Sequence, residues 1–121
     1  MNSDELQLFN LIDNARVNAG CARLEQDPGL TDAARADAGN RAESGATNSA
    51  SGSASTAGGD NWSAQQAFNQ MMTQSKSTVL NCGLTTLGVG RKSAKYCNAI
   101  NLLGFCVGSK PTRVAWVADF S

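Results

Sequence analysis

The chain of 121 residues contains no histidine. Imidazole is the side chain whose ordinary pKa suits proton transfer near neutral pH, and it is the commonest protein ligand of metal ions. A catalytic zinc site usually needs three protein ligands, mostly imidazoles with a carboxylate. The absence of histidine therefore argues against a zinc enzyme and against the usual acid–base catalysis. We predict a protein that is not an enzyme, with no metal, no cofactor and no catalytic residue.

Long apolar runs and an excess of charge of one sign are also missing. No run of about 18 apolar residues occurs, so no segment is predicted to span a membrane. The ten basic and ten acidic side chains give a net charge of zero, so there is no overall electrostatic reason to expect nucleic acid or an anionic membrane as partner.

The charges are nevertheless distributed unevenly along the chain. Residues 1–60 hold nine acidic and four basic side chains, whereas residues 61–121 hold one acidic and six basic ones. One interpretation is a basic sheet edge that follows acidic helix faces. The other is a basic partner-binding face that comprises Arg91, Lys92, Lys95, Lys110 and Arg113.

No pair of cysteines has C-x-x-C spacing, which gives no indication of a zinc site or of thioredoxin-like redox chemistry. An even number of cysteines in so short a chain favours two disulfides, for which three pairings are open, among Cys21, Cys82, Cys97 and Cys106. Because disulfides persist in oxidising compartments, we expect an exported protein, either secreted or held at the cell envelope. The first residues do not resemble a signal peptide, so we expect that a leader has been removed and that Met1 is a start codon added for expression.

Two helices are predicted in the first third of the chain. Residues 4–19 carry apolar side chains at helical spacing and are followed by a glycine, which ends the helix. The next helix begins with Asp27 as N-cap and Pro28 in the first position, and it continues to about Ser44. Its inner face carries mostly small residues, which allow a helix to lie close to whatever it covers.

The second half of the chain changes from helical to strand periodicity. Ser63 begins a helix with a capping box, and this helix ends near Ser75. Alternating apolar residues predict a strand from Thr85 and another over residues 112–120, with either one more strand or an irregular hairpin between them. Three helices followed by a few antiparallel strands are typical of an α+β fold.

The stretch SGATNSASGSASTAGG, residues 44–59, has no charged, aromatic or large aliphatic side chain. Dividing the chain there would leave pieces of about 43 and about 62 residues, which are marginal for independent folding. We therefore predict a single domain over residues 1–121 with a flexible, low-complexity internal loop at about residues 45–58.

Three stretches resemble the CAP superfamily, which includes cysteine-rich secretory proteins, venom antigen 5 and plant pathogenesis-related proteins. NLIDNARVNAGCARLEQDPGLTDAARADA (residues 10–38) resembles the first two helices of its bacterial secreted members. STVLNCGLTTLGVG (77–90) resembles the segment that leads into the first central strand, and VAWVADF (114–120) the closing strand. The resemblance implies an α-β-α sandwich with a small antiparallel sheet and about three helices. It also implies a Cys21–Cys82 disulfide, which by default leaves Cys97 to pair with Cys106.

Members of this superfamily typically have a cleft with histidines and acidic residues, which sometimes binds zinc. By this resemblance, cleft histidines correspond to Ser49 and Ser75, and the family's Gly-Glu-Asn motif reads Gly59-Asp60-Asn61. One aspartate and two serines cannot hold a divalent metal with useful affinity, so the resemblance implies a lost metal site. The candidate residues of the emptied cleft are Ser49, Asp60, Asn61, Ser75 and Trp62, the last as a ligand-facing aromatic.

We therefore expect a non-catalytic, secreted CAP-like domain that is a monomer and binds an apolar small molecule, a lipid or a protein, but not nucleic acid. Two alternatives stay open. The first is a hydrolase with a histidine-independent site around Asp60, and the second is a structural or surface-exposed module.

Overall fold

The computed structural model of the chain describes residues 1–97 and 100–121. Four helices form within these residues: α1 (Ser3–Asn18), α2 (Pro28–Ser44), α3 (Ala64–Gln74) and the short α4 (Lys76–Val79). The three predicted helices are confirmed, and α4 adds one turn that the sequence analysis did not separate from α3. None of the described helices is long and apolar enough to span a bilayer.

The helix starts follow the predicted capping residues. The Asp27 side chain accepts hydrogen bonds from two backbone N–H groups at the start of α2, and Pro28 occupies the first helical position. At the start of α3, Ser63 and Gln66 form the predicted capping box, in which each side chain accepts from the other's backbone N–H. These side chains satisfy N–H groups that have no partner inside the helix.

Five strands form one sheet in the order β1-β4-β7-β3-β2. The three longest are β3 (Ala54–Asp60), β4 (Thr86–Lys95) and β7 (Thr112–Phe120), and the outer two are β1 (Glu25–Gln26) and β2 (Ser49–Ser51). All neighbours are antiparallel except the two-residue β1, which runs parallel to β4. The sheet is therefore mixed, and the expectation of a wholly antiparallel sheet needs this correction.

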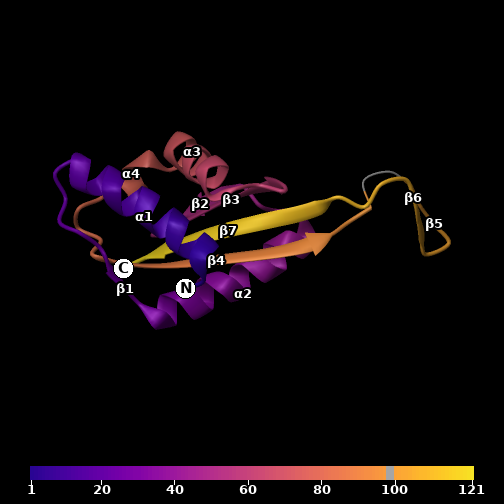
Figure 1. Cartoon of the computed structure of the whole chain (residues 1–121), viewed down its shortest axis with the longest axis horizontal. Coiled ribbons are helices and arrows are strands. Elements are labelled where there is room, and N and C mark those ends of the chain that lie inside the picture. The colour runs from indigo at the N-terminus through magenta and orange to yellow at the C-terminus, as the bar shows by residue number, and fades with distance from the viewer. Residues whose placement is uncertain (98–99) are drawn as a thin grey trace.

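Helices cover both faces of this sheet, as Figure 1 shows. On one face, α1, α3 and α4 enclose the main core, which includes Leu8, Met71 and Trp116. On the other face, the alanines of α2 pack against Ala115 and Val117 of β7. Successive residues of β7 thus belong to opposite cores, so the predicted alternation over residues 112–120 and the α-β-α sandwich are both confirmed.

The layer between α2 and the sheet is thin because glycine stands where a larger residue would touch the helix. A Cβ added at Gly90 would lie 2.3 Å from the carbonyl carbon of Ala34 and from the amide nitrogen of Arg35. A Cβ added at Gly88 would lie 2.2 Å from the amide nitrogen of Thr31. The backbones of β4 and α2 are therefore in direct contact, as the small residues of this helix predicted.

The prediction of an unstructured loop at residues 45–58 is wrong in its secondary structure. Residues 49–60 form the β2–β3 hairpin, and β3 pairs with β7 along its whole length, from Ala54 to Asp60. Ser55, Thr56 and Ala57 are buried. Small side chains suffice in β3 because large neighbouring side chains fill the space beside it. A Cβ added at Gly59 would lie only 2.1 Å from the indole Nε1 of Trp62. Composition alone could not reveal those neighbours.

One buried arginine ties the helical layer to the loop that precedes β4. The guanidinium of Arg16, on α1, donates to the carbonyl oxygens of Val79, Asn81 and Leu84, the first two at 2.9 and 3.0 Å. Its side chain is almost fully buried and also lies over the ring of Phe120. Burial lowers the pKa of Arg16, although its proximity to Asp13 opposes this change.

Both disulfides implied by the resemblance are present: Cys21–Cys82 and Cys97–Cys106. The first joins the end of α1 to the segment before β4, across 61 residues of sequence. The second lies beyond the main sheet, where β5 (Ile100–Leu102) and β6 (Phe105–Val107) form a separate two-stranded hairpin. Figure 1 shows this hairpin projecting from the distal ends of β4 and β7, while both chain termini lie in the half of the molecule away from it.

Candidate functional site

The structure places the residues of the expected cleft in two separate groups. Ser49 and Ser75 lie near each other at the β2–α3 side, because the Gln74 amide donates to the carbonyl of Ser49 and to that of Thr56 in β3. The Ser49 hydroxyl is 3.2 Å from Thr56 Oγ1. The buried Ser75 hydroxyl donates to the carbonyl of Met71 at 3.0 Å and is hydrogen-bonded to Ser55. Both hydroxyls are thus engaged within the fold.

Asp60, Asn61 and Trp62 form the second group, at the other end of β3. Asn61 has a positive φ of 54° and donates its N–H to the carbonyl of Thr112. The Trp62 carbonyl accepts from the Trp116 indole at 3.0 Å, and the Trp62 ring packs against β3 beside the main core. Trp62 is therefore half-buried as a packing residue at this position.

The carboxylate of Asp60 accepts a hydrogen bond from the hydroxyl of Tyr96 at 2.7 Å. This bond raises the pKa of the Tyr96 phenol, because deprotonation would place two negative charges together. The Arg113 guanidinium lies 4.0 Å from the centre of the Tyr96 ring and donates to the carbonyls of Ala42 and Glu43 at the end of α2. Sequence reasoning did not identify Tyr96, the only tyrosine in the chain.

No group of three or more histidine, cysteine, aspartate or glutamate side chains is placed to hold a metal ion within residues 1–97 and 100–121.

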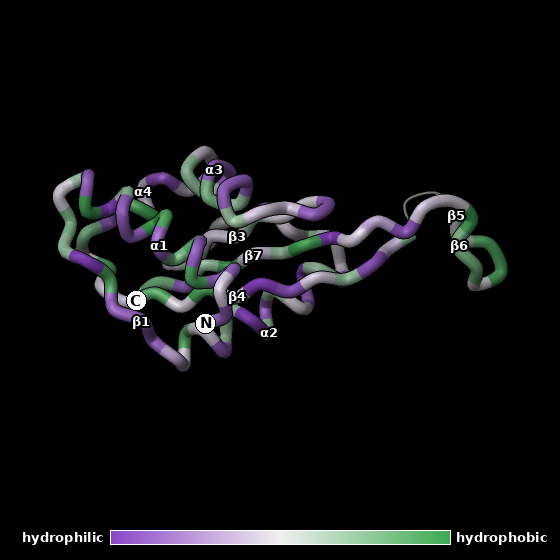
Figure 2. Tube along the Cα trace, in the orientation of Figure 1, coloured by the Kyte–Doolittle hydropathy of each residue, from purple (hydrophilic) through white to green (hydrophobic). Residues whose placement is uncertain are grey.

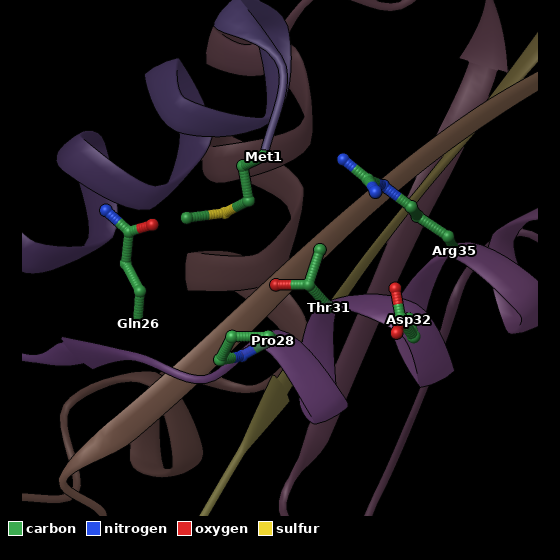
Figure 3. Close-up of a pocket in the computed structure, with 6 residues that line it drawn as sticks. All are labelled: Met1, Gln26, Pro28, Thr31, Asp32 and Arg35. Atoms are coloured by element: carbon green, nitrogen blue, oxygen red, sulfur yellow. The ribbon is translucent and has the colours of Figure 1, made fainter.

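A shallow pocket of about 140 Å³ lies between the N-terminal ends of α1 and α2, as Figure 3 shows. Its lining residues are Met1, Gln26, Pro28, Thr31, Asp32 and Arg35. Pockets for drug-sized ligands usually measure about 300–1,000 Å³, so this one is too small for a bulky apolar molecule.

Of the two charged residues that line this pocket, Asp32 and Arg35, the arginine is already paired inside the protein. Arg35 donates to both carboxylate oxygens of the buried Glu5, at 3.0 Å from Nε to Oε2 and 2.6 Å from Nη2 to Oε1. Glu5 also accepts from the backbone N–H groups of Asn2 and Arg91. Burial by itself would raise the pKa of Glu5, but these hydrogen bonds lower it overall. The pair therefore joins α1, α2 and β4, which is a structural role.

The segment with the strongest signs of an external partner is the projecting hairpin, residues 96–97 and 100–111, which we call the arm. At its base the Tyr96 N–H donates to the carbonyl of Pro111. Leu102 pairs with Phe105 across a two-residue turn, Leu103-Gly104, and both turn residues have positive φ, 52° and 81°. Such turns usually contain Asn-Gly or Asp-Gly, because a branched side chain is strained at positive φ. The geometry of the turn therefore does not explain why position 103 is a leucine.

The tip of the arm exposes large apolar side chains to solvent. The exposed fractions are 58% for Leu102, 91% for Leu103, 75% for Phe105 and 54% for Val107. Figure 2 shows this end of the molecule as a hydrophobic segment separated from the two cores. Of the described large apolar residues that are exposed, only Leu6 on α1, at 37%, lies outside the arm. Contiguous exposed apolar groups of this kind mark interaction sites.

The structure divides the predicted basic face into arginines that lie over aromatic rings and lysines that are exposed. Arg91 lies over the ring of Trp116, 5.5 Å from its centre, and Arg113 lies over Tyr96 as described above. Lys92, Lys95 and Lys110 are exposed; Lys95 immediately precedes the arm, and Lys110 is the second-last residue of the arm. Lys95 reaches the hydroxyl of Thr112 at 3.3 Å.

No model of a known protein family matches the sequence, and no curated protein matches it either. Among solved structures, the chain is similar to that of MpPR-1i, a pathogenesis-related PR-1 protein of the CAP type, with a TM-score of 0.69 and 14% identity. The match covers 100% of this chain and 90% of that one. The chain therefore has a CAP-like fold, and a likeness at this identity concerns the fold alone.

Proposed function

We propose that the protein is an exported, non-catalytic interaction module with a CAP-like fold, and that the arm is the element that contacts an apolar partner. The observation that carries this proposal is the exposure of Leu102, Leu103, Phe105 and Val107 on a disulfide-linked hairpin outside both cores. Leaving such side chains in water is unfavourable by about 1.5–3 kcal/mol for a full side chain, so a partner that covers them would gain this energy.

Several contacts support a role other than catalysis. The carboxylate of Asp60 is hydrogen-bonded to Tyr96, and the hydroxyls of Ser49 and Ser75 are bonded within the fold. A nucleophilic serine needs an adjacent base to activate it, and the chain offers no histidine for this purpose. The same lack of imidazole supports the loss of the metal site that the superfamily often has.

Two disulfides support a location outside the reducing cytosol. The Cys97–Cys106 bridge also supports the function of the arm directly. An isolated two-stranded hairpin is marginally stable in water, and none of the described residues of this one belongs to either core. The bridge holds it in shape without burial, so that little conformational entropy remains to be lost when the tip meets its partner.

The test uses micelles of dodecyl maltoside, an uncharged detergent, as a generic apolar partner for the oxidised protein. We expect the ¹H–¹⁵N resonances of residues 102–107 to shift or broaden on titration, while those around the pocket at Arg35 do not. The double variant Leu103→Ser/Phe105→Ser should lose this response. Its matched control is Leu6→Ser, which replaces an exposed leucine on α1.

The proposal is wrong if the micelles perturb the region around Trp62 in place of the arm, which would favour an apolar ligand bound at the body of the domain. It is equally wrong if the double variant responds like the unaltered protein.

A further inference from the structure

We propose that the partner of the arm is an anionic lipid surface, into which the tip of the arm inserts while lysines at its base contact the headgroups. This inference rests on the proposed function and names the partner for the same element. It depends on how the apolar and basic residues are ordered along the arm.

The apolar residues of the arm are confined to its far end. Leu103 is at the turn, Leu102 and Phe105 are adjacent to it, and Val107 is two residues further along. Because an extended strand rises roughly 3.3 Å per residue, β6 spans about 10 Å. Interfacial apolar segments are typically buried by about 5–10 Å at the boundary between headgroups and acyl chains. The tip therefore has the length required for shallow insertion.

Shallow insertion also suits the backbone of the arm. The two strands pair with each other, but each has an outer edge that pairs with no other strand of the described sheets. Unpaired backbone N–H and C=O groups are unfavourable in the hydrocarbon core and are tolerated where water remains. A two-stranded hairpin can thus rest at the interface but cannot span the bilayer.

The lysines lie on the body side of the apolar tip. Lys110 is three residues beyond Val107, and Lys95 ends β4 immediately before the arm. No acidic residue occurs between Asp60 and Asp119, so the whole segment from Lys92 to Arg113 carries only positive charge. Basic residues that flank an inserted segment are attracted to the negative potential of an anionic leaflet. The net charge of zero for the chain does not oppose this, because no acidic side chain lies within this segment of the sequence.

Two acidic residues, Asp60 and Glu43, lie near the base of the arm. The Asp60 carboxylate accepts from Tyr96, whose ring lies under Arg113. Glu43 lies one residue before the end of α2, and its backbone carbonyl accepts from the same Arg113. Neither contact involves Lys95 or Lys110. Both lysines are exposed, and the Lys95 ammonium can exchange its surface hydrogen bond to the Thr112 hydroxyl for one to a lipid phosphate. Tyr96 itself is the kind of amphipathic ring that is enriched at membrane interfaces.

A second copy of the chain fits the tip less well. A stable protein interface buries about 800 Å² on each partner. The tip offers four apolar side chains on a hairpin that stands away from the body (Figure 1), so a protein that covered the tip alone would bury much less. A lipid surface has no such minimum area, since binding there increases with each inserted side chain.

The test is co-sedimentation of the oxidised full chain with sucrose-loaded vesicles of two compositions: phosphatidylcholine alone, and phosphatidylcholine with 30% phosphatidylglycerol. We expect at least tenfold stronger partitioning to the anionic vesicles at 50 mM NaCl, and most of that preference to disappear at 500 mM NaCl. Leu103→Ser/Phe105→Ser should abolish binding to both. Lys95→Gln/Lys110→Gln should remove the anionic preference but leave the response to dodecyl maltoside micelles intact. Lys76→Gln on α4 is the matched control, and circular dichroism melting checks that each variant folds.

The outcomes separate this inference from the proposed function. Equal binding to both vesicles, or binding only to micelles, would overturn the anionic-lipid assignment while the arm remained an apolar contact element. A dimer in sedimentation analysis that dissociates in Leu103→Ser/Phe105→Ser would also overturn it, in favour of a second copy. Failure with vesicles and micelles alike would overturn both proposals.

Discussion

Replacing Gly90 by alanine should open the layer between α2 and the sheet. The added methyl would lie 2.3 Å from the Ala34 carbonyl carbon and the Arg35 amide nitrogen, and 2.6 Å from the Ala34 carbonyl oxygen. Carbon atoms in good contact are about 3.5–4.0 Å apart, so one backbone must move by roughly 1 Å or more. These atoms belong to the middle of α2, so no flexible side chain can make way.

The size of the effect follows from what the displacement would disturb. Overfilling a packed core typically destabilises a protein by about 1–3 kcal/mol. Here the displaced element is a whole helix, and its alanine face, Ala34, Ala38 and Ala42, would separate from Ala115 and Val117. A gap of about 1 Å forfeits a quarter to a half of the dispersion energy of each contact. We therefore expect a loss of about 3 kcal/mol in the free energy of unfolding.

The assay is urea unfolding followed by far-ultraviolet circular dichroism with both disulfides intact. With a slope of about 1.5 kcal/mol per molar urea, the loss corresponds to a midpoint lower by about 2 M. The matched control is Gly39→Ala on the same helix, where the new Cβ would meet Lys92 Cγ at a comfortable 3.8 Å. That change should stabilise the protein by about 0.5–1 kcal/mol, since alanine favours helix over glycine.

Two results would refute this reasoning. In the first, the free energy of unfolding of Gly90→Ala lies within about 0.5 kcal/mol of that of the unaltered protein, which would mean that α2 can move away from the sheet at little cost. In the second, Gly39→Ala destabilises as much as Gly90→Ala, which would mean that the effect is not specific to the contact with β4.

Three further predictions concern buried or paired polar groups. Glu5→Gln should lower the free energy of unfolding at pH 7. The difference from the unaltered protein should shrink as the pH falls below about 4.5, because the lowered pKa of Glu5 stabilises the fold only while the carboxyl is ionised. Urea unfolding midpoints from pH 7 to pH 3 measure this difference. Asp60→Asn should lower the pKa of Tyr96 towards its ordinary value of 10.0, and absorbance at 295 nm reports it without interference from another tyrosine. Arg16→Met should lose about 3 kcal/mol in urea unfolding, because three carbonyls lose their donor; a loss below about 1 kcal/mol would contradict this role.

The elements that the sequence predicted well are those specified by neighbouring residues. The start of α2 depends on Asp27 and Pro28, and that of α3 on Ser63 and Gln66, all within four residues of the helix they begin. The alternation in β7 is equally local, since it needs only a two-sided sheet. The Cys21–Cys82 pairing came from the resemblance to the CAP superfamily, because spacing alone allowed three pairings.

The elements that the sequence missed depend on distant neighbours. β3 consists of alanine, serine, threonine, glycine and one aspartate, and it is a strand because β7 pairs with it on one side and β2 on the other. The candidate residues fall into two groups with separate hydrogen-bond partners, with Ser75 at the end of α3 and Asp60 beside Tyr96. The arm could have been suspected from four large apolar residues around a glycine turn, enclosed by two close cysteines. Its projection into solvent depends on where β4 and β7 end, which only the fold determines.

The placement of both termini in the half of the molecule away from the arm gives the molecule a direction (Figure 1). A tether joined to Met1 or Ser121 would be attached away from the arm and would leave the arm free. This holds for a natural extension, a biotin tag or a fluorescent protein. A sensor chip loaded through either terminus would present the arm outward in a uniform orientation. In a longer polypeptide, the same geometry would let this domain act as a spacer that holds its apolar tip away from whatever it is attached to.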